Sequence, residues 1–189
     1  LKEIRKICNQ FNALFFLDEV QSGFGRSGKL FAYEWADINP DIIAVAKGIG
    51  SGFPMGACLT SDDACIAMIK GSHGSTFGGN PLAVAVGKAV INEILSNNFL
   101  DNVDKIARYL WNKLIILEKK YDEIIEVRGA GLLLGIKTKN LNTQISKKFE
   151  EKGLLTIPAS DNVIRLAPPL IITFDHVDEA IRKIEDALV

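Results

Sequence analysis

Two charged side chains in this sequence each follow a short apolar run. Lys47 comes directly after residues 42–46, and Asp18 comes directly after residues 15–17. An amine that closes an apolar strand and precedes Gly48 is partly shielded from water, which favours its uncharged form, the nucleophile toward a carbonyl. A carboxylate at a neighbouring strand end is what a pyridinium nitrogen needs to stay protonated and act as an electron sink. Together the two residues indicate amine–carbonyl chemistry, although either alone could be an ordinary surface charge.

A single arginine interrupts a later apolar run. Arg165 stands within residues 163–166, shortly before Pro168 and Pro169. Burying a guanidinium is costly unless it meets an anion, and its planar fork matches a carboxylate. The run therefore predicts a carboxylate-binding arginine, with an edge-strand arginine that faces water as the alternative.

A glycine-rich loop at residues 71–80 carries three hydroxyl side chains, of which Ser75 and Thr76 are adjacent. It leads into Pro81, a residue typical of the first position of a helix. Hydroxyls, free backbone N–H groups and a helix start together suit a phosphate oxygen. A flexible linker before a capped helix explains the same residues equally well.

The segment Gly23 to Gly28 matches G-x-G-x-x-G, and its extension to Lys29 matches the start of a P-loop. Leu30 stands where a P-loop needs Ser or Thr to hold magnesium. The preceding strand also ends in two carboxylates, where a pyrophosphate would have to lie. We therefore interpret the segment as a turn-forming loop rather than a nucleotide site.

Elements that would position these residues can be read from the apolar pattern. Residues 15–17 and 42–46 are apolar on both faces, which predicts central strands of a parallel sheet covered by helices. Ligands of such sheets bind at the carboxyl ends of the strands, where Asp18 and Lys47 stand. We expect a helix over residues 1–11, a further strand over 55–60 and a helix over 81–95.

The chain after residue 96 reads as a separate α+β unit, so we divide it into domains 1–95 and 96–189. One apolar helical face is expected, followed by two strands, a helix that ends near Gly153, two more strands, and a last helix that Asp175 could cap. The apolar face comprises Val103, Ile106, Ala107, Leu110, Leu114 and Leu117.

Composition excludes several classes of function. The 189 residues carry 22 basic and 23 acidic side chains, which gives no electrostatic reason to expect nucleic acid or an anionic membrane as partner. No apolar run reaches the length of a membrane span, despite a mean hydropathy of +0.16. Three cysteines without a C-x-x-C motif and two distant histidines argue against disulfides and metal sites, and favour the cytoplasm.

Taken together, these residues resemble the class III (ornithine-type) pyridoxal-phosphate aminotransferases. The resemblance implies an α/β fold, the PLP-dependent transferase fold type I, as the C-terminal half of the large domain plus the α+β C-terminal small domain. The matching blocks, in order, are Leu17-Asp18-Glu19-Val20-Gln21, Gly23 to Gly28, Pro40-Asp41-Ile42, Ala46-Lys47-Gly48, Gly52-Phe53-Pro54, Gly71 to Pro81, Arg128-Gly129, Gly131-Leu132 and Val163 to Pro168.

The resemblance also implies an activity and a partner. It implies transfer of an amino group from an ω-amino substrate such as N-acetylornithine to 2-oxoglutarate, in arginine biosynthesis, with ornithine or 4-aminobutyrate as alternative donors. It further implies a homodimer whose active site is shared between subunits.

Roles for individual residues follow from the same resemblance. Lys47 would bind pyridoxal 5′-phosphate covalently and carry the proton between substrate and cofactor. Asp18 would pair with the pyridine nitrogen, Val20 would pack on the ring, and Gln21 would bond the phenolic oxygen. Ser75 and Thr76 would contact the phosphate of the cofactor held by the other subunit, while Arg165 would bind the substrate α-carboxylate.

Members of this family carry a long stretch before the position of Leu1, with part of the phosphate cradle and the aromatic residue that stacks on the ring. We therefore expect this chain to be the later part of such an enzyme. We expect the isolated chain to bind the cofactor weakly and to turn over little, with a non-catalytic fragment as the alternative.

Overall fold

A computed structural model describes residues 1–96 and 98–189 of the chain. The chain divides into two compact units, Leu1–Phe99 and Leu100–Val189. Each unit has its own sheet, and each is described by itself below.

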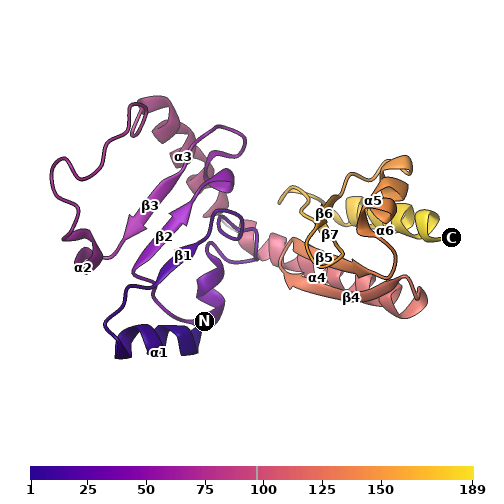
Figure 1. Ribbon diagram of the computed structural model, residues 1–189. Coiled ribbons are helices and arrows are strands. Elements are labelled where there is room, and N and C mark those ends of the chain that lie inside the picture. The colour runs from indigo at the N-terminus through magenta and orange to yellow at the C-terminus, as the bar shows by residue number, and fades with distance from the viewer. Residues whose placement is uncertain (97) are drawn as a thin grey trace. The chain divides into compact units, whose positions relative to one another are not determined.

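The first unit is built on a three-stranded mixed sheet in the order β1-β2-β3 (Figure 1). Strands β1 (Phe16–Asp18) and β2 (Ile42–Val45) are parallel, and β3 (Ala57–Thr60) runs antiparallel to β2. Each of the two parallel strands is followed by a loop that starts at the same edge of the sheet, because Asp18 is paired with Ala44. This register places the ends of both apolar runs side by side.

Of the two strands predicted to be central, β2 has a neighbouring strand on each side in the described sheet. In the described sheet β1 lies at the edge, and the third strand is antiparallel. Phe16 is 57% exposed and Leu59 is 42% exposed. Apolar side chains on both faces of a strand predict that other elements cover those faces. They do not predict which strands form hydrogen bonds with its two edges.

The remaining elements of the first unit surround this sheet. They are the helices α1 (Lys2–Gln10), α2 (Asp62–Cys65) and α3 (Pro81–Ile94) and the short 3-10 helices η1 (Ala32–Ala36) and η2 (Lys47–Gly50). The predicted start of α3 is confirmed: Pro81 is its first residue, and the Asn80 side chain accepts a hydrogen bond from the Ala83 N–H at 2.9 Å. Helix α3 contacts η2, the element that begins at Lys47.

An ion pair ties α1 to the sheet. Arg5 Nη1 lies 2.5 Å from Asp41 Oδ2, and the same oxygen accepts a hydrogen bond from the Phe15 N–H at 2.6 Å. These contacts hold the pKa of the Asp41 carboxyl below its usual range, chiefly through the Phe15 N–H and then through Arg5. Asp41 therefore joins the start of β2 to the segment that enters β1.

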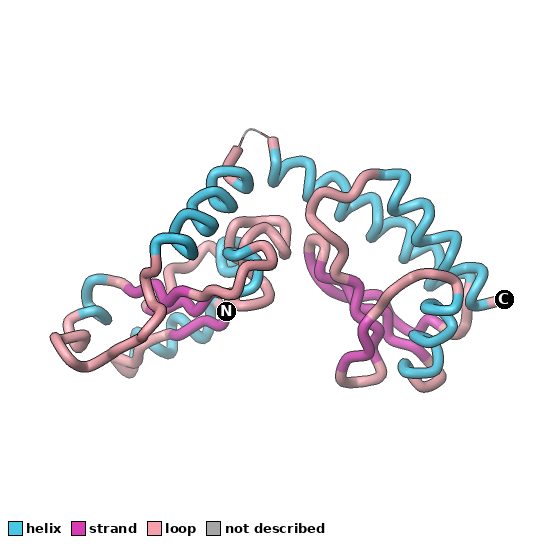
Figure 2. Tube along the Cα trace, turned by 90° about the horizontal axis from the view of Figure 1, so that it is seen from above, coloured by secondary structure: helices cyan, strands magenta, loops and turns pink. Residues whose placement is uncertain are grey.

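The second unit packs helices on one side of a four-stranded antiparallel sheet, as Figure 2 shows. Its strand order is β4-β5-β7-β6, and its elements are α4 (Phe99–Lys120), β4 (Ile124–Ala130), β5 (Leu133–Thr138), α5 (Asn142–Glu151), β6 (Ile157–Ala159), β7 (Val163–Leu166) and α6 (Phe174–Leu188). All six residues of the predicted apolar face of α4 are buried. The predicted helix stop is also confirmed, since Gly153 follows α5 with a φ of +76°.

One detail of the second unit differs from the prediction. The cap of α6 is Thr173, whose side chain accepts the His176 N–H, and Asp175 lies inside the first turn. Thr173 has the extended backbone (φ −108°, ψ 174°) that a capping residue needs, and His176 Nδ1 accepts the Thr173 N–H at 3.1 Å in return.

Candidate active site

Lys47 is the first residue of η2, directly beyond the end of the central strand β2. Its backbone lies in the left-handed region, with a φ of 45°. Its exposed side chain reaches across to the loop after β1, where Nζ donates a hydrogen bond to Gln21 Oε1 at 2.7 Å. A non-glycine residue in this backbone region is strained, and such strain is common at functional sites.

The chain beyond Lys47 is held by close packing. A Cβ atom placed on Gly48 would lie 2.8 Å from the Cβ of Phe24, whose side chain is 4% exposed. Ile49 and Gly50 are buried in the same turn. Because Gly48 has no side chain, the loop that carries Phe24 can lie directly against the backbone next to Lys47.

Asp18 ends the neighbouring parallel strand, and its side chain is exposed. Its Oδ1 accepts a hydrogen bond from the Val20 N–H at 2.9 Å, which orients the carboxylate at the strand end. The structure thus places Asp18, Val20, Gln21 and Lys47 at one edge of the sheet, on two adjacent chain segments.

The glycine-rich segment Gly23 to Gly28 is a loop of consecutive turns, as predicted. Phe24, Gly25 and Gly28 have φ values of 55°, 85° and 90°. A P-loop leads into an α-helix that binds phosphate at its N-terminus, whereas here the next element is the short 3-10 helix η1. The loop serves instead to carry Phe24 against Gly48.

Sequence reasoning missed Glu19, which is only 3% exposed. Its Oε1 accepts the Tyr33 N–H at 2.9 Å, and its Oε2 accepts a hydrogen bond from Ser22 Oγ. Burial raises the pKa of the Tyr33 hydroxyl, and the charges of Glu34 and Glu19 add to this effect. No spacing in the sequence indicated this burial, because it depends on the hydrogen-bond partners that Ser22 and the Tyr33 backbone supply.

Ser75 and Thr76 lie in the exposed connection between α2 and α3. Ser75 Oγ accepts a hydrogen bond from the Gly78 N–H at 2.9 Å. Among the contacts described for the chain, none joins either hydroxyl to Lys47 or Asp18. The structure therefore does not bring the predicted phosphate ligands to the lysine within one chain.

Arg165 belongs to the second unit, on the interior strand β7, where it is paired with Gly135 of β5 and Ile157 of β6. The alternative of an edge-strand arginine is therefore wrong. Its Nε atom is buried and has no hydrogen-bond partner among the described residues. A buried guanidinium nitrogen without an acceptor is suited to an anion.

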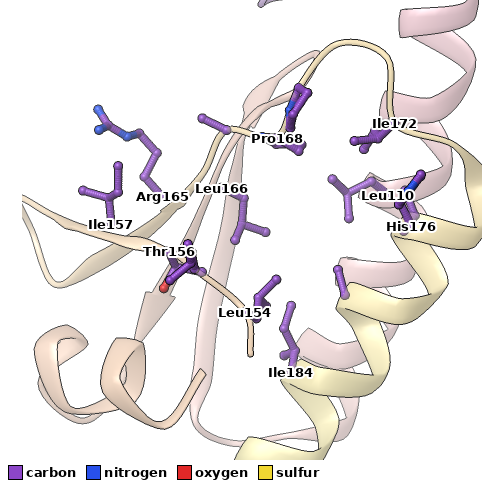
Figure 3. A pocket seen from close by; sticks show the side chains of 15 residues that line it. Leu110, Leu154, Thr156, Ile157, Arg165, Leu166, Pro168, Ile172, His176 and Ile184 are labelled. Carbon is purple, nitrogen blue, oxygen red and sulfur yellow. The ribbon is translucent and has the colours of Figure 1, made fainter. Parts of the chain in front are cut away.

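A cavity of about 310 Å³ borders Arg165 in the second unit. Figure 3 shows Arg165 and Ile157 on one side of it, with the guanidinium directed away from Leu110, Ile184 and the other residues of the helices. The lining is almost wholly apolar. The arginine thus presents its charged end at the rim of an apolar recess rather than inside it.

Over residues 1–96 and 98–189, no helix is both long and apolar enough to cross a lipid bilayer. Over the same residues, no three side chains of the metal-binding types come together as a candidate ion site.

The sequence pattern of the family "Aminotransferase class-III" matches residues 1–188. This chain belongs to the class-III aminotransferases. Its blocks around Asp18, Lys47 and Arg165 are thus parts of one family sequence, and the α/β fold agrees with solved members of the family at TM-scores of 0.87 to 0.92.

Similar proteins of known name include acetylornithine aminotransferases from two bacteria. The one from Mesorhizobium japonicum is 48% identical over 185 residues, covering 97% of this chain and 46% of the relative. The one from Clostridium acetobutylicum is 43% identical over 190 residues, covering 100% of this chain and 49% of the relative.

Similar solved structures include an ornithine aminotransferase from Plasmodium yoelii, with a TM-score of 0.92, 35% identity, and coverage of 99% of this chain and 50% of that one. An N-acetylornithine aminotransferase from Stenotrophomonas maltophilia has a TM-score of 0.87 and 34% identity, with coverage of 98% and 50%. The chain therefore spans about half the length of the relatives it matches.

Proposed function

We propose that this chain carries the lysine-bearing part of a pyridoxal-phosphate aminotransferase site. The observation that supports this most directly is the hydrogen bond of Lys47 Nζ to Gln21, beside the carboxylate of Asp18 at the end of the adjacent parallel strand. Membership of the class-III family supplies the type of reaction. These side chains supply an amine, a carboxylate and an amide. Such groups suit the aldehyde, the pyridine nitrogen and the phenolic oxygen of this cofactor.

Pyridoxal phosphate, when bound, supplies an electron sink for the pair of electrons left on the substrate carbon that carries the transferred amino group. In this chain Asp18 would hold a proton at the pyridine nitrogen, and Val20 would pack on one ring face. Gln21 would donate a hydrogen bond from its amide to the phenolic oxygen. Lys47 would attach to the cofactor through Nζ and, once released, take the proton from the substrate carbon that carries the transferred amino group.

The backbone of Lys47 suits this double task. A residue held in the left-handed region by a buried Ile49 and a close Gly48 presents its side chain from a fixed base. Only the four-carbon stem needs to move between the bound and the released positions. The fixed base limits the loss of conformational entropy when the amine meets its target.

Ser75 and Thr76 fit a site that two chains build together. Both are exposed and stand on a connection that makes no described contact with Lys47. We therefore assign them to the phosphate of a cofactor bound by a second copy of the chain, in a homodimer. Exposed apolar residues Ile66, Ile69 and Phe77 on and beside the same connection, 71% to 82% exposed, are consistent with contact to another chain.

Arg165 would bind the α-carboxylate of amino-acid and 2-oxo-acid substrates. Its unpartnered, buried Nε supports this role, because a carboxylate can accept from two guanidinium nitrogens at once. N-acetylornithine is the proposed amino donor and 2-oxoglutarate the acceptor, on the similarity to acetylornithine aminotransferases. The likeness to an ornithine aminotransferase structure makes ornithine the second candidate donor.

We also propose a domain assignment and a cellular compartment for this chain. Residues 1–95 would be part of the large cofactor-binding domain, and residues 96–189 the small domain. The three cysteines are free, which agrees with a reducing compartment such as the cytoplasm.

The cofactor proposal is tested by titrating the full-length protein that contains this chain with pyridoxal phosphate and recording the visible absorption of the lysine-bound form. Lys47→Ala is expected to abolish the band. Lys88→Ala, which removes an exposed lysine on α3, is expected to leave it unchanged. A band that persists in Lys47→Ala would refute the assignment.

Donor choice is tested separately, by comparing N-acetylornithine, ornithine and 4-aminobutyrate with 2-oxoglutarate as acceptor. Binding of the cofactor through Lys47 without turnover of any donor would favour the alternative of a non-catalytic chain. Turnover of ornithine above N-acetylornithine would replace the proposed donor.

A further inference from the structure

Glu19 is the most deeply buried charged side chain among the described residues. No hydrogen bond or ion pair described for the chain joins its carboxylate to Lys47 or Gln21. Its exposed fraction is 3%, while its neighbour Asp18 is exposed. A buried carboxylate is costly unless hydrogen bonds replace its water. Glu19 has two such bonds, from Ser22 Oγ and from the Tyr33 N–H at 2.9 Å.

These bonds tie together both ends of the loop that follows β1. Ser22 lies near the start of the loop, and Tyr33 lies in η1 at its far end. The backbone of Glu19 adds two more contacts: its N–H donates to the Ala44 carbonyl at 2.9 Å, and its carbonyl accepts the Gly23 N–H at 3.0 Å. One residue thus joins β2, the start of the loop and its end.

The same loop sets the surroundings of Lys47 in two ways. Gln21 accepts the hydrogen bond of Lys47 Nζ, and Phe24 lies against Gly48, the next residue along the chain. A Cβ on Gly23 would come within 2.8 Å of the Glu19 carbonyl oxygen, so the turn that begins at Glu19 is also closely packed against the Glu19 backbone. A shift of the loop would therefore move both contacts.

We propose that Glu19 is a positioning residue for Lys47: its buried carboxylate holds the loop after β1, so that Gln21 keeps the amine in place. The link to catalysis rests on the function proposed above, but the effect on the amine does not depend on it. The competing explanation is that Glu19 only stabilises the fold of the first unit.

The test is the rate at which formaldehyde and cyanoborohydride methylate Lys47, measured by mass spectrometry relative to Lys88 in the same molecule. The hydrogen bond to the Gln21 amide oxygen has to break before the Lys47 amine can turn toward formaldehyde. Removing this acceptor in Gln21→Ala is expected to raise the Lys47 to Lys88 ratio about three-fold, the effect of one ordinary hydrogen bond.

Glu19→Gln keeps the shape of the side chain but removes one of its two acceptor oxygens. We expect it to raise the same ratio in the same direction. In the Gln21→Ala background it should change the ratio no further, because two residues that act through one contact are not additive. Glu34→Gln is the matched control: Glu34 also accepts a backbone N–H, from Phe31, but it is exposed and does not bond Ser22 or Tyr33.

Fluorescence of Trp35, two residues beyond Tyr33, reports whether the loop region stays folded. A folded Glu19→Gln chain with the labelling ratio of the parent would overturn the proposal. The proposal would also be overturned if Glu19→Gln raised the ratio equally in the parent and in the Gln21→Ala background. If Glu19→Gln unfolds, Ser22→Ala decides, since it removes one donor to Glu19 and leaves the carboxylate. A raised ratio there supports positioning, and a ratio equal to the parent refutes it.

The cofactor proposal and the positioning role of Glu19 are contradicted by different measurements. A full-length protein that does not take up pyridoxal phosphate through Lys47 contradicts the proposed function but leaves the labelling ratios interpretable. Conversely, cofactor uptake that depends on Lys47 with labelling insensitive to Glu19 contradicts only the positioning role.

Discussion

Lys47 and Gln21 are 26 residues apart in sequence and are joined by a hydrogen bond of 2.7 Å between Nζ and Oε1. The two residues follow adjacent parallel strands, β2 and β1, so the bond spans the carboxyl edge of the sheet. An amide is a neutral acceptor, which orients the amine without the strong electrostatic stabilisation that a carboxylate would give.

Replacing this amide by a carboxylate should make the lysine less reactive. In Gln21→Glu the new charge lies next to the ammonium, and at an exposed site one such pair is worth about 1 kcal/mol, or about a five-fold lower rate of methylation. The ratio of Lys47 to Lys88 labelling measures the effect at neutral pH and low salt. High salt should weaken it, and an unchanged ratio would mean that the side chain at position 21 has turned away.

Asp41 should make the first unit sensitive to acid. Because its pKa is lowered in the folded chain, its contribution to the free energy of unfolding is present above about pH 4, the ordinary value for an aspartate. That contribution is lost as the pH falls further, when the carboxyl is protonated. Asp41→Asn should reduce the free energy of unfolding by about 1 kcal/mol at pH 7.

The measurement is urea unfolding followed by Trp35 in a Trp111→Phe background, so that only the first unit is observed. The difference between parent and Asp41→Asn should disappear toward pH 3. Asp122→Asn, at an exposed position in the second unit, is the control. A difference that stays constant from pH 3 to pH 7 would contradict the role of the charge.

Gly129 should tolerate no side chain. It has a φ of +133°, and a Cβ atom there would lie 2.2 Å from the Leu133 carbonyl oxygen, across the β4–β5 pair. Gly129→Ala should lower the free energy of unfolding of the second unit by about 2 to 4 kcal/mol. Trp111 fluorescence follows this unit in a Trp35→Phe background.

Gly74→Ala serves as its counterpart, because nothing lies within 4 Å of a Cβ at that position and its φ is ordinary. Since Gly74 lies in the first unit, its effect is followed by Trp35 fluorescence in a Trp111→Phe background. It should change stability by less than about 0.5 kcal/mol. Equal effects of the two substitutions would show that the β4–β5 turn can rearrange.

Arg165 should determine affinity for dicarboxylates. Arg165→Ala removes charge-assisted hydrogen bonds, and a loss of about 2 kcal/mol corresponds to roughly 30-fold weaker binding of 2-oxoglutarate. Arg165→Lys keeps the charge without the planar fork, so its affinity for 2-oxoglutarate should lie between those of the parent and Arg165→Ala. Calorimetric titration measures the affinities, and Arg182→Ala, an exposed position on α6, is the control. Binding that is insensitive to Arg165 would remove it from the site.

Much of the fold could be predicted because the second unit has a strong helical period. The six apolar positions of α4, from Val103 to Leu117, recur at intervals of three and four residues apart from the adjacent pair Ile106 and Ala107, and all are buried. The cap of α6 was harder to predict from the sequence, because Thr173 and Asp175 are both good capping residues. The choice depends on which of them has the extended backbone.

The candidate site was predictable only in part. The ends of apolar runs indicated Asp18 and Lys47, but the bond between Lys47 and Gln21 depends on the path of a loop that has no period to read. Glu19 was hidden for a different reason: an acidic residue is expected to be exposed, and its burial depends on partners supplied by Ser22 and the Tyr33 backbone. Spacing in sequence contains neither piece of information.

The left-handed backbone of Lys47 has a consequence for any attempt to engineer this protein. Glycine would adopt a φ of 45° without steric strain, so Lys47→Gly should make the chain more stable by about 1 kcal/mol while removing the amine. A selection that rewards only heat resistance or expression would therefore favour loss of this lysine. Directed evolution of the chain should accordingly screen for amine reactivity in every round, because at this position robustness and reactivity are selected in opposite directions.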